Sequence, residues 1–470
     1  MSLTDSRGVP LSTNHGSLLR LYEQALNLSV GYFLDPLARI QSALDADPGF
    51  AMGHCLRAGL LVMATDRNVV PLLAESVEAV EALGRRANDR ERAHAAAARA
   101  WLEGDFAGSI RRYGDILLDY PQDLLALQVA HVGDFFLGAS SMLRDRVAQV
   151  LPSWHPDMPG FSYVLGMYAF GLEETALFSR AEDTGRRALE MNPRDPWAVH
   201  AVAHVMEMQG RLRDGIEWLS ARESDWALNN GFAFHNWWHL ALYHLDAGPD
   251  VSGSANVLEL YDRKIRPTPS QAPLEMIDAA AMLWRLQLRG VDVGKRWEQL
   301  VEGWEPFAEH AYYAFNDVHA VMTFVGARRF DLAQRTLAAM EQRAWGVHTN
   351  AMMTRDVGLP LANALVSFGM EQYAEAVNML LPIRTIAHRF GGSNAQRDLI
   401  HLTLTEAALR SGNAKLARAL ASERTQLKPT SPFNWQLTAR ALQLQGDSAG
   451  AAKANETVGA RRKAQFAFAQ

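Results

Sequence analysis

The sequence predicts an all-α fold built from repeated helix pairs, and three observations lead to this prediction. Apolar residues recur at spacings of three and four over almost all of the chain from Leu18 onward, which is the period of an amphipathic helix. Alternating runs of Val, Ile and Thr, which would favour strands, are absent from the sequence. Short motifs that end in proline recur at a nearly constant distance, as stacked repeats would require.

The repeat is clearest where helices are expected to end. Residues 43–48 (ALDADP) and 188–193 (ALEMNP) are near copies, and residues 116–121 (ILLDYP) are a looser third. The three closing prolines are 73 and 72 residues apart, twice a unit of about 36 residues, which is close to the tetratricopeptide length. Each helix pair would carry an apolar face that only a neighbouring pair can bury. The predicted fold class is therefore an all-α, tetratricopeptide-like helical-repeat superhelix, a solenoid that curls around a central pocket.

Further segments fit the same unit. Residues 104–113 (GDFAGSIRRY) have the composition of an inter-helix turn followed by the start of a second helix. Looser units occur around residues 330–335 and 373–377. Near the C-terminus, four residues recur at tetratricopeptide spacing: Trp435, Ala439, Leu442 and Gly446.

The chain is expected to have three parts. Residues 1–16 are polar and rich in Gly and Pro, which predicts a flexible N-terminal arm. Residues 17–265 would form N-terminal helical repeats, and residues 266–470 would form C-terminal repeats that continue the same superhelix. The division is placed at residues 266–273 (RPTPSQAP) because this stretch has the most linker-like composition.

Composition and charge narrow the expected partners and location. A net charge of −6 without a block of like charge argues against nucleic acid as a partner. The single cysteine, Cys55, excludes a disulfide framework and fits a reducing compartment. The N-terminus lacks a signal-peptide pattern, and no window approaches 18 uncharged apolar residues. We therefore expect a soluble, cytoplasmic protein without a membrane partner.

Five of the fifteen histidines lie between residues 193 and 246. His200 and His204 are four residues apart, and so are His235 and His239. Residues at this spacing share one face of a helix. Two consecutive helices that each present a pair of imidazoles are therefore predicted.

Pro193 and Gly210 fix the register of the first histidine helix, because one precedes it and the other follows it. In this register, four residues fall on the stripe that lines the concave groove of tetratricopeptide repeats: Trp197, His200, His204 and Glu207.

The histidine pairs have three interpretations. Imidazole titrates near neutral pH, so it suits acid–base chemistry, and its neutral form is a common metal ligand. Imidazole and carboxylate together would suit a divalent metal such as zinc, iron or manganese. The spacing resembles the zinc pair of metalloprotease helices, but no glutamate follows His200 as His-Glu-x-x-His requires. In the third interpretation the rings are hydrogen-bonded interior residues packed against Trp197, Trp237 and Trp238.

Four segments carry a resemblance to a known family: residues 200–210 (HAVAHVMEMQG), 235–244 (HNWWHLALYH), 316–319 (NDVH) and 391–398 (GGSNAQRD). Through them the chain resembles the family of tetratricopeptide repeat protein 38 and its bacterial relatives. The resemblance implies a helical-repeat fold and brings no activity common to the family. Asn394 stands where relatives are expected to have histidine.

Two of these segments supply further candidates. Asn316 and His319 are one helical turn apart and can face the same side, whereas Asp317 is turned away and has an equally good structural interpretation. In the last segment, Ser393 or Asn394 can cap a helix.

Residues 396–398 would then open the first turn of that helix. Arg397 is a cation where the helix dipole disfavours one. This indicates a fixed anionic partner from the protein or from a ligand, and Gln396 and Asp398 could orient a substrate beside it.

The predicted function is to bind a small polar or anionic molecule in a His/Trp-rich concave pocket, with or without transforming it by acid–base or metal-assisted chemistry such as hydrolysis. The alternative is a tetratricopeptide scaffold that binds a peptide or protein partner in its groove. A divalent metal is the cofactor that these side chains would suit, and the sequence leaves open whether the protein is an enzyme. The catalytic candidates are His200, His204, Glu207, His235, His239 and Asp398. The substrate-binding candidates are Trp197, Trp238, Asn316, His319, Gln396 and Arg397.

Overall fold

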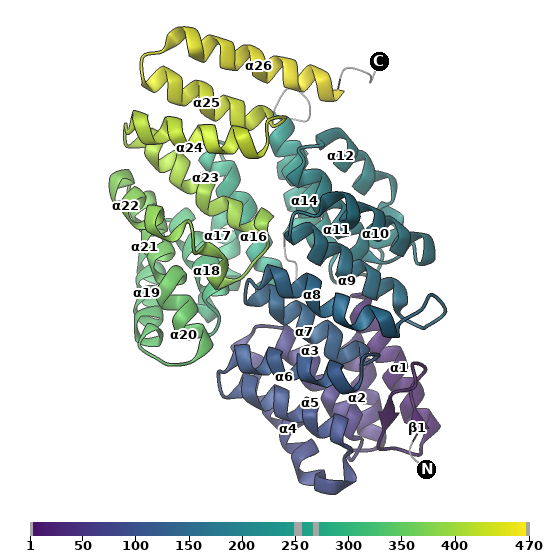
Figure 1. The fold of residues 1–470 in the computed structure, drawn as a ribbon. Helices are drawn as coiled ribbons and strands as arrows, with labels where there is room; N and C mark the ends of the chain where they lie inside the picture. The colour runs from purple at the N-terminus through teal and green to yellow at the C-terminus, as the bar shows by residue number, and fades with distance from the viewer. Residues whose placement is uncertain (1–2, 249–255, 267–271, 467–470) are drawn as a thin grey trace. The chain divides into compact units, whose positions relative to one another are not determined.

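The computed structural model describes residues 3–248, 256–266 and 272–466, and within them the chain is almost entirely helical (Figure 1). In these ranges the only named strands are β1 (Leu3–Thr4) and β2 (Pro10–Leu11), which pair antiparallel. The predicted all-α repeat fold is thereby confirmed. Of the predicted linker, residues 267–271 lie outside the described residues. None of the helices in the described ranges has both the length and the apolar character needed to cross a bilayer.

The helices group into two compact units. The first consists of Met1–Val202, Ser224–Ala233 and Gly346–Met352. The second consists of Ala203–Glu223, Phe234–Trp345 and Met353–Gln470. The residues up to 202 thus belong to the first unit, and the division of the repeats at 265/266 stays a prediction.

The helices of the first unit follow one another as antiparallel neighbours. They are α1 (Gly16–Val30), α2 (Pro36–Ala46), α3 (Ala51–Met63), α4 (Val70–Leu83), α5 (Asp89–Leu102), α6 (Phe106–Asp119), α7 (Leu124–Phe136), α8 (Ser140–Val150), α9 (Phe161–Glu174) and α10 (Phe178–Met191), after which α11 (Pro196–Met208) begins. Short helices α13 (Glu223–Trp226) and α20 (Thr349–Met353) belong largely to the two outlying segments of this unit.

The second unit continues in the same manner. Its helices are α12 (Leu212–Ala221), α14 (Ala233–Ala247), α16 (Pro273–Leu288), α17 (Arg296–Trp304), α18 (Ala314–Gly326), α19 (Phe330–Ala344), α21 (Leu359–Gly369), α22 (Tyr373–Ile383), α23 (Asn394–Arg410), α24 (Ala414–Leu427), α25 (Pro432–Leu444) and α26 (Ser448–Phe466). Two π turns precede α16 and α21, at Tyr261–Ile265 and Thr354–Gly358. Short 3₁₀ turns occur at Arg67–Val69, Gly84–Arg86, Leu151–Ser153, Glu305–Phe307 and Ala387–Phe390.

The predicted repeat boundaries coincide with helix ends. Pro48, Pro121 and Pro193 each stand two residues beyond the last residue of α2, α6 and α10, because proline cannot continue a helix. The predicted turn at Gly104 is also confirmed. Gly104 has a φ of +82°, a conformation that glycine adopts without a steric penalty, and the Asp105 side chain caps α6 by accepting from the amide of Gly108 at 2.8 Å.

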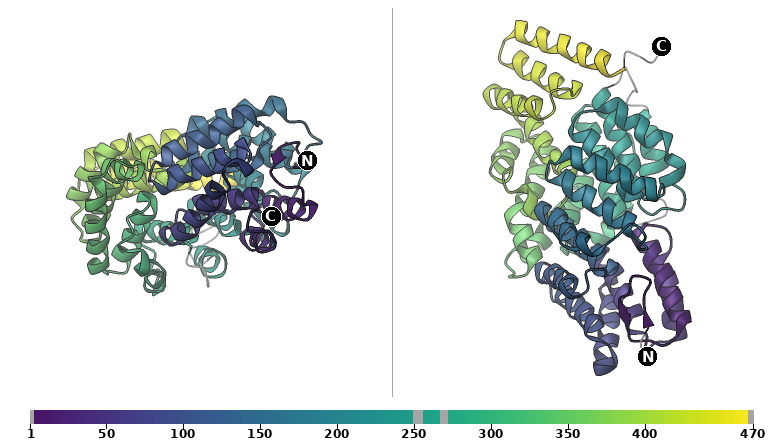
Figure 2. Two further views of the ribbon diagram at one scale, coloured as in Figure 1. Left: turned by 90° about the horizontal axis from the view of Figure 1, so that it is seen from below. Right: turned by 45° about the vertical axis from the view of Figure 1, so that its right-hand side comes forward.

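The predicted C-terminal unit is the helix pair α25 and α26. Ala439 and Leu442 of α25 pack against Ala451 and Ala454 of α26, with Trp435 beside them. Small side chains allow the two helices to lie close together. In Figure 1 and in the right view of Figure 2, the helices α24 to α26 lie side by side at the yellow end of the chain.

The segment predicted to be a flexible arm contains a hairpin. The amide of Leu3 donates to the carbonyl of Thr13 at 3.0 Å, and Val9 and Leu11 are buried. Arg7 forms an ion pair of 2.9 Å with Asp5 inside the hairpin. Apolar burial and this ion pair therefore give the segment fixed contacts that its Gly- and Pro-rich composition does not indicate.

A buried ion pair ties three helices of the first unit together. Asp123, at the start of α7, accepts from Arg90 Nε at 2.6 Å and contacts His94 Nε2 at 2.8 Å, both from α5. The other Asp123 oxygen accepts from the amide of Ala126 at 3.0 Å, which caps α7. Arg90 also donates to the hydroxyl of Tyr22 on α1 at 3.3 Å. Asp123 therefore neutralises a guanidinium that has no exposed surface.

Asp123→Ala should destabilise the protein by about 3–5 kcal/mol, because it leaves the Arg90 charge buried without its partner. Chemical denaturation would measure the change in the free energy of unfolding. Asp119→Ala removes an exposed carboxylate at the end of α6 and should change it by less than about 0.5 kcal/mol. Equal effects of the two substitutions would contradict this role for Asp123.

Candidate functional site

The first histidine helix, α11, begins at a well-defined cap. Asp195 Oδ1 accepts from the amides of Trp197 and Ala198, each at 3.0 Å, and Pro196 occupies the first helical position, where its missing N–H costs nothing. Burial raises the pKa of Asp195 to about 7. The cap fixes where α11 starts, and hence which of its residues share the face that carries the histidines.

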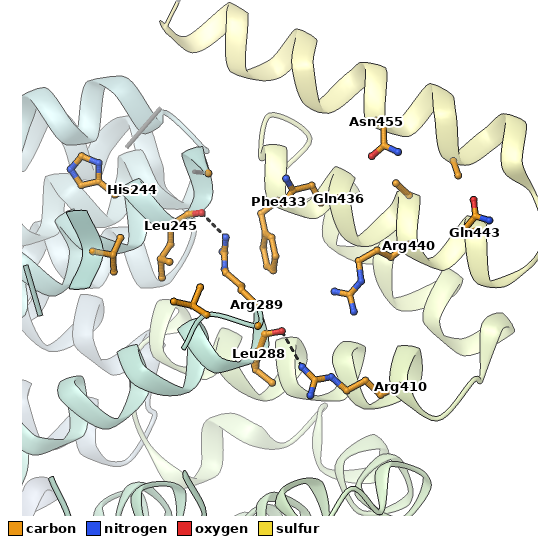
Figure 3. Close-up of a pocket in the computed structure, with 16 residues that line it drawn as sticks. His244, Leu245, Leu288, Arg289, Arg410, Phe433, Gln436, Arg440, Gln443 and Asn455 are labelled. Carbon is orange, nitrogen blue, oxygen red and sulfur yellow. Dashed lines mark hydrogen bonds between the residues drawn. The ribbon is translucent and has the colours of Figure 1, made fainter. Parts of the chain in front are cut away.

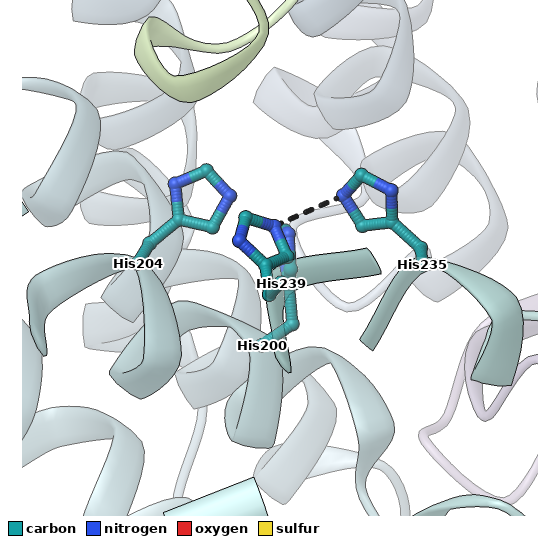
Figure 4. A group of neighbouring side chains, drawn as sticks. All are labelled: His200, His204, His235 and His239. Atoms are coloured by element: carbon teal, nitrogen blue, oxygen red, sulfur yellow. Dashed lines mark hydrogen bonds between the residues drawn. The ribbon is translucent and has the colours of Figure 1, made fainter. Parts of the chain in front are cut away.

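Four histidines of α11 and α14 lie close together (Figure 4). The ring centroids of His204 and His239 are 4.4 Å apart, and those of His235 and His239 are 4.8 Å apart. Each of these three rings and His200 can offer one nitrogen so that all four atoms lie within 4.8 Å of one another. His204 and His239 have no exposed surface, and His235 is 8% exposed.

Two carboxylates orient the second pair of rings. Glu207 Oε2 lies 2.8 Å from Nδ1 of His239, and Asp278 Oδ2, from α16, lies 2.6 Å from Nδ1 of His235. An ionised carboxylate only accepts hydrogen bonds, so each Nδ1 carries the proton and donates it. In a neutral ring Nε2 is then the acceptor nitrogen, which is the form of imidazole that binds metal ions.

The two Nε2 atoms face each other at 3.3 Å (Figure 4, dashed line). Two lone pairs at this distance repel unless a proton or a metal cation lies between them. Two nitrogens bound to zinc at 2.0–2.1 Å in tetrahedral geometry are about 3.3–3.4 Å apart. The observed separation therefore equals that of two imidazole ligands on one metal ion.

The surroundings favour the neutral, metal-binding form of His239. Burial, followed by the neighbouring His204 and His235, lowers the pKa of His239 well below its usual value. His204 brings a third ring to the same place. Catalytic zinc sites have three protein ligands and a fourth position for water or substrate, and His200 is the fourth histidine of the present group. Metal-bound histidines usually donate their second N–H to a carboxylate, as His235 and His239 do.

A small polar cavity of about 50 Å³ lies on the far side of Glu207. The second oxygen of Glu207 is 3.6 Å from Nζ of Lys428. Four cations line the cavity: Arg285, Arg289, Arg424 and Lys428. Three carboxylates line it: Glu207, Asp246 and Asp398. The side chains that line this cavity therefore carry one more positive charge than negative charges.

Asp398, predicted from the sequence as a catalytic group, lines this cavity as an ion-pair partner. It accepts from both terminal nitrogens of Arg424, at 2.7 and 3.2 Å, and Arg285 lies at 4.0 Å. Burial alone would raise the pKa of Asp398, but these guanidinium groups hold it well below its usual range. Asp398 is thus a fixed anion near Glu207, and it does not take up a proton at neutral pH.

The predicted tryptophan walls pack behind the histidines. Trp238 has no exposed surface and stacks on His235 with ring centroids 5.4 Å apart. Trp197 stacks on Tyr32 at 5.4 Å and lies 5.0 Å from the ring of His200. These contacts hold the rings of His200 and His235 in place, and neither tryptophan lines the polar cavity.

The candidates on α18 lie in the packed interior. His319 Nδ1 donates to the carbonyl of Phe315 at 2.7 Å, and burial lowers the pKa of His319 to about 4. Asn316 and Asp317 are also buried, at 7% and 5% exposed. Burial raises the pKa of Asp317 to about 8 although Arg343 opposes the shift. His319 and Asp317 are therefore both neutral near pH 7.

The candidates at the start of α23 make local contacts. Ser393 is the N-cap, and Gln396 completes a capping box with it, as the capping interpretation predicts. Arg397 donates to Asn394 Oδ1 at 2.9 Å and to the carbonyls of Gly391 and Gly392. These bonds hold the Arg397 guanidinium against the turn that precedes its own helix.

The cations of the polar cavity were not predicted, although the sequence holds a signal for them. Arg285 and Arg289 are four residues apart at the end of α16, and Arg424 and Lys428 are four apart at the end of α24. This is the same one-face spacing that singles out the histidines. Asp278 has no comparable signal, because its role depends on where α16 packs.

Comparison with known proteins adds only a general likeness, and no family model matches this chain. The chain is similar to human IFIT1 in a dimer with PPP-AAAA, at 13% identity and a TM-score of 0.42, over 96% of this chain and 95% of that chain. The similarity to yeast Tom70 is 12% sequence identity and a TM-score of 0.34, over 96% of each chain. The structure of Naa15/Naa10 bound to HypK-THB is similar at 14% sequence identity and a TM-score of 0.27, over 97% of this chain and 72% of that chain.

Likeness at this level says nothing about ligand or activity. From its own helix pairs and repeat spacing, the chain is a helical-repeat protein of tetratricopeptide type. Membership of the tetratricopeptide repeat protein 38 family stays a prediction.

The raised pKa of Asp317 predicts how the stability of the protein depends on pH. The folded state keeps a proton up to about pH 8 that the unfolded chain releases near pH 4. Between these values unfolding releases a proton, so stability should fall as pH rises, by up to about 1.4 kcal/mol per pH unit. Asp317→Asn should remove this contribution and flatten the slope between pH 5 and 8 in denaturation experiments. The same slope in both proteins would show that Asp317 is already ionised when folded.

Proposed function

We propose that this protein binds a divalent metal ion of zinc type through His204, His235 and His239, and that the metal binds and activates a small anionic molecule. One observation carries the proposal. The Nε2 atoms of His235 and His239 face each other at 3.3 Å while each Nδ1 contacts a carboxylate oxygen. This arrangement directs two acceptor nitrogens toward one position, which supports a metal cation as their shared ligand.

A proton is the competing occupant. If His235 were an imidazolium, its Nε2 could donate to Nε2 of His239 and the pair would need no metal. Two features favour the metal. The ring of His204 lies near that of His239, with 4.4 Å between centroids. A proton shared by His235 and His239 would not require this third ring. The burial that lowers the pKa of His239 also disfavours protonation of that ring.

The surroundings favour an anionic ligand for such a metal. Arg285 and Lys428 line the cavity beside Glu207, so positive charge from the protein would add to that of the ion. A metal with an open position can polarise a bound oxygen or lower the pKa of a bound water to about 7. The reaction class that these properties support best is metal-assisted hydrolysis of a small anionic substrate.

The alternative of a scaffold for an extended peptide receives less support at this place. His204 and His239 have no exposed surface, so a peptide lying on a groove could not reach them. Buried imidazoles can take part in binding only if the ligand is an ion or a small molecule.

Titration of metal-free protein with Zn²⁺, followed by calorimetry, should show one bound ion per chain. Co²⁺ in its place should give the absorption bands of a four-coordinate site. His204→Ala and His239→Ala should each abolish binding and change stability in the absence of metal by about 1–2 kcal/mol or less. His155→Ala, which removes an exposed histidine (59% side-chain exposure), should bind like the wild type. Loss of folding in both histidine variants, together with no zinc binding by the wild type, would favour the packing interpretation.

The two carboxylates give a second, independent prediction. Glu207→Gln and Asp278→Asn keep the shape of each side chain and remove the charge that orients its histidine. Each should weaken zinc binding about 10–100-fold without abolishing it. Competition with a chelator of known affinity would measure the dissociation constants. Unchanged affinity in both variants would show that the carboxylate–imidazole bonds do not serve a metal.

A further inference from the structure

A second and much larger cavity lies in the second unit, beside α14, α16, α25 and α26 (Figure 3). Its volume is about 740 Å³, within the range of about 300–1,000 Å³ that is usual for sites of small organic ligands. One side of its lining is apolar, formed by Leu245, Val257, Leu288 and Phe433. These side chains are nearly fully buried, at 1–7% exposed, and they form an apolar floor.

The polar part of the lining is cationic. Arg289, Arg410 and Arg440 line the cavity, and no carboxylate is among the described residues that line it. The amides of Gln436 and Gln443 complete this side (Figure 3). Three guanidinium groups and an apolar floor are the complement of a molecule that has an anionic head and an apolar body.

The guanidinium groups are held in place by the protein. Arg289 donates to the carbonyl of Leu245 at 2.5 Å and lies 3.4 Å above the ring of Phe433. Arg410 and Arg440 both contact the carboxylate of Glu406, at 3.4 and 3.0 Å, and Glu406 has no exposed surface. A single carboxylate thus serves two guanidinium groups, so the cavity keeps an excess of positive charge.

We infer that this cavity is a binding site for an amphipathic organic anion, whose carboxylate, sulfonate or phosphate head is held by Arg410 and Arg440 and whose apolar body lies on Phe433 and Leu288. The bidentate donors of arginine suit such head groups. The site does not require a metal ion, so it goes beyond the proposed metal centre and can be tested separately. Its wall residues Leu245, Arg289 and Phe433 also line the polar cavity beside Glu207.

The test uses the fluorescent anion 1-anilinonaphthalene-8-sulfonate on the folded, full-length protein. Its fluorescence should rise on binding at one site per chain. Decanoate should displace it, whereas decanol and decylamine, which have the same chain without the negative charge, should not displace it at equal concentration. Arg440→Gln should weaken binding of both anions about tenfold or more, the effect of losing one charge-assisted hydrogen bond. Arg410→Gln should act in the same direction.

Matched controls separate this site from adventitious binding and from the metal centre. Arg418→Gln removes an exposed arginine of α24 that does not line the cavity, and it should leave affinity unchanged. Gln436→Trp should block the cavity and abolish displaceable binding, with circular dichroism confirming that the helices remain. His239→Ala should keep wild-type affinity for the dye even though it loses zinc. Equal affinity of wild type, Arg440→Gln and Gln436→Trp would overturn the inference, as would displacement by decylamine as effective as by decanoate.

Discussion

Two hydrogen bonds between carboxylate and imidazole determine how the centre of this protein is arranged. Glu207 holds His239 at 2.8 Å and Asp278 holds His235 at 2.6 Å. With Nδ1–H of each ring committed to a carboxylate, Nε2 is an acceptor whenever the ring is neutral. The two Nε2 atoms are 3.3 Å apart, a separation at which they can share a proton or bind one metal cation. Without the two carboxylates, both rings could turn their donors inward and the same histidines would be ordinary interior residues.

The electrostatics of the second unit follow from how its cations are placed. Guanidinium groups from α16, α23, α24 and α25 line the two cavities, and together with Lys428 the cations outnumber the carboxylates in both. Arg289 belongs to both linings, and burial lowers its pKa to about 10, so it stays charged at neutral pH. A protein whose net charge is −6 thus concentrates positive charge on internal surfaces. The net negative charge of the whole chain therefore does not predict the charge of the ligands that these internal surfaces would attract.

The sequence allowed the fold to be predicted well because tetratricopeptide-type repeats are local. Proline positions and small residues mark the helix ends within a single unit, and Pro48, Pro121 and Pro193 stand just beyond the ends of their helices. The N-terminal hairpin was not predicted, because the burial of Val9 and Leu11 depends on helices far away in the sequence. The division of the repeats at the Pro-rich stretch depends on composition alone and stays a prediction.

By itself the sequence determined which histidines share a helix face, since a spacing of four residues fixes this through the geometry of one helix. It also determined that Glu207 follows His204 on that face. Only the tertiary structure decided that His239 contacts Glu207, which is 32 residues away, and that His235 contacts Asp278, which is 43 residues away. The physical reason is that periodicity describes one helix at a time. Hydrogen bonds between helices depend on crossing distances that arise when many repeats bury their apolar faces together.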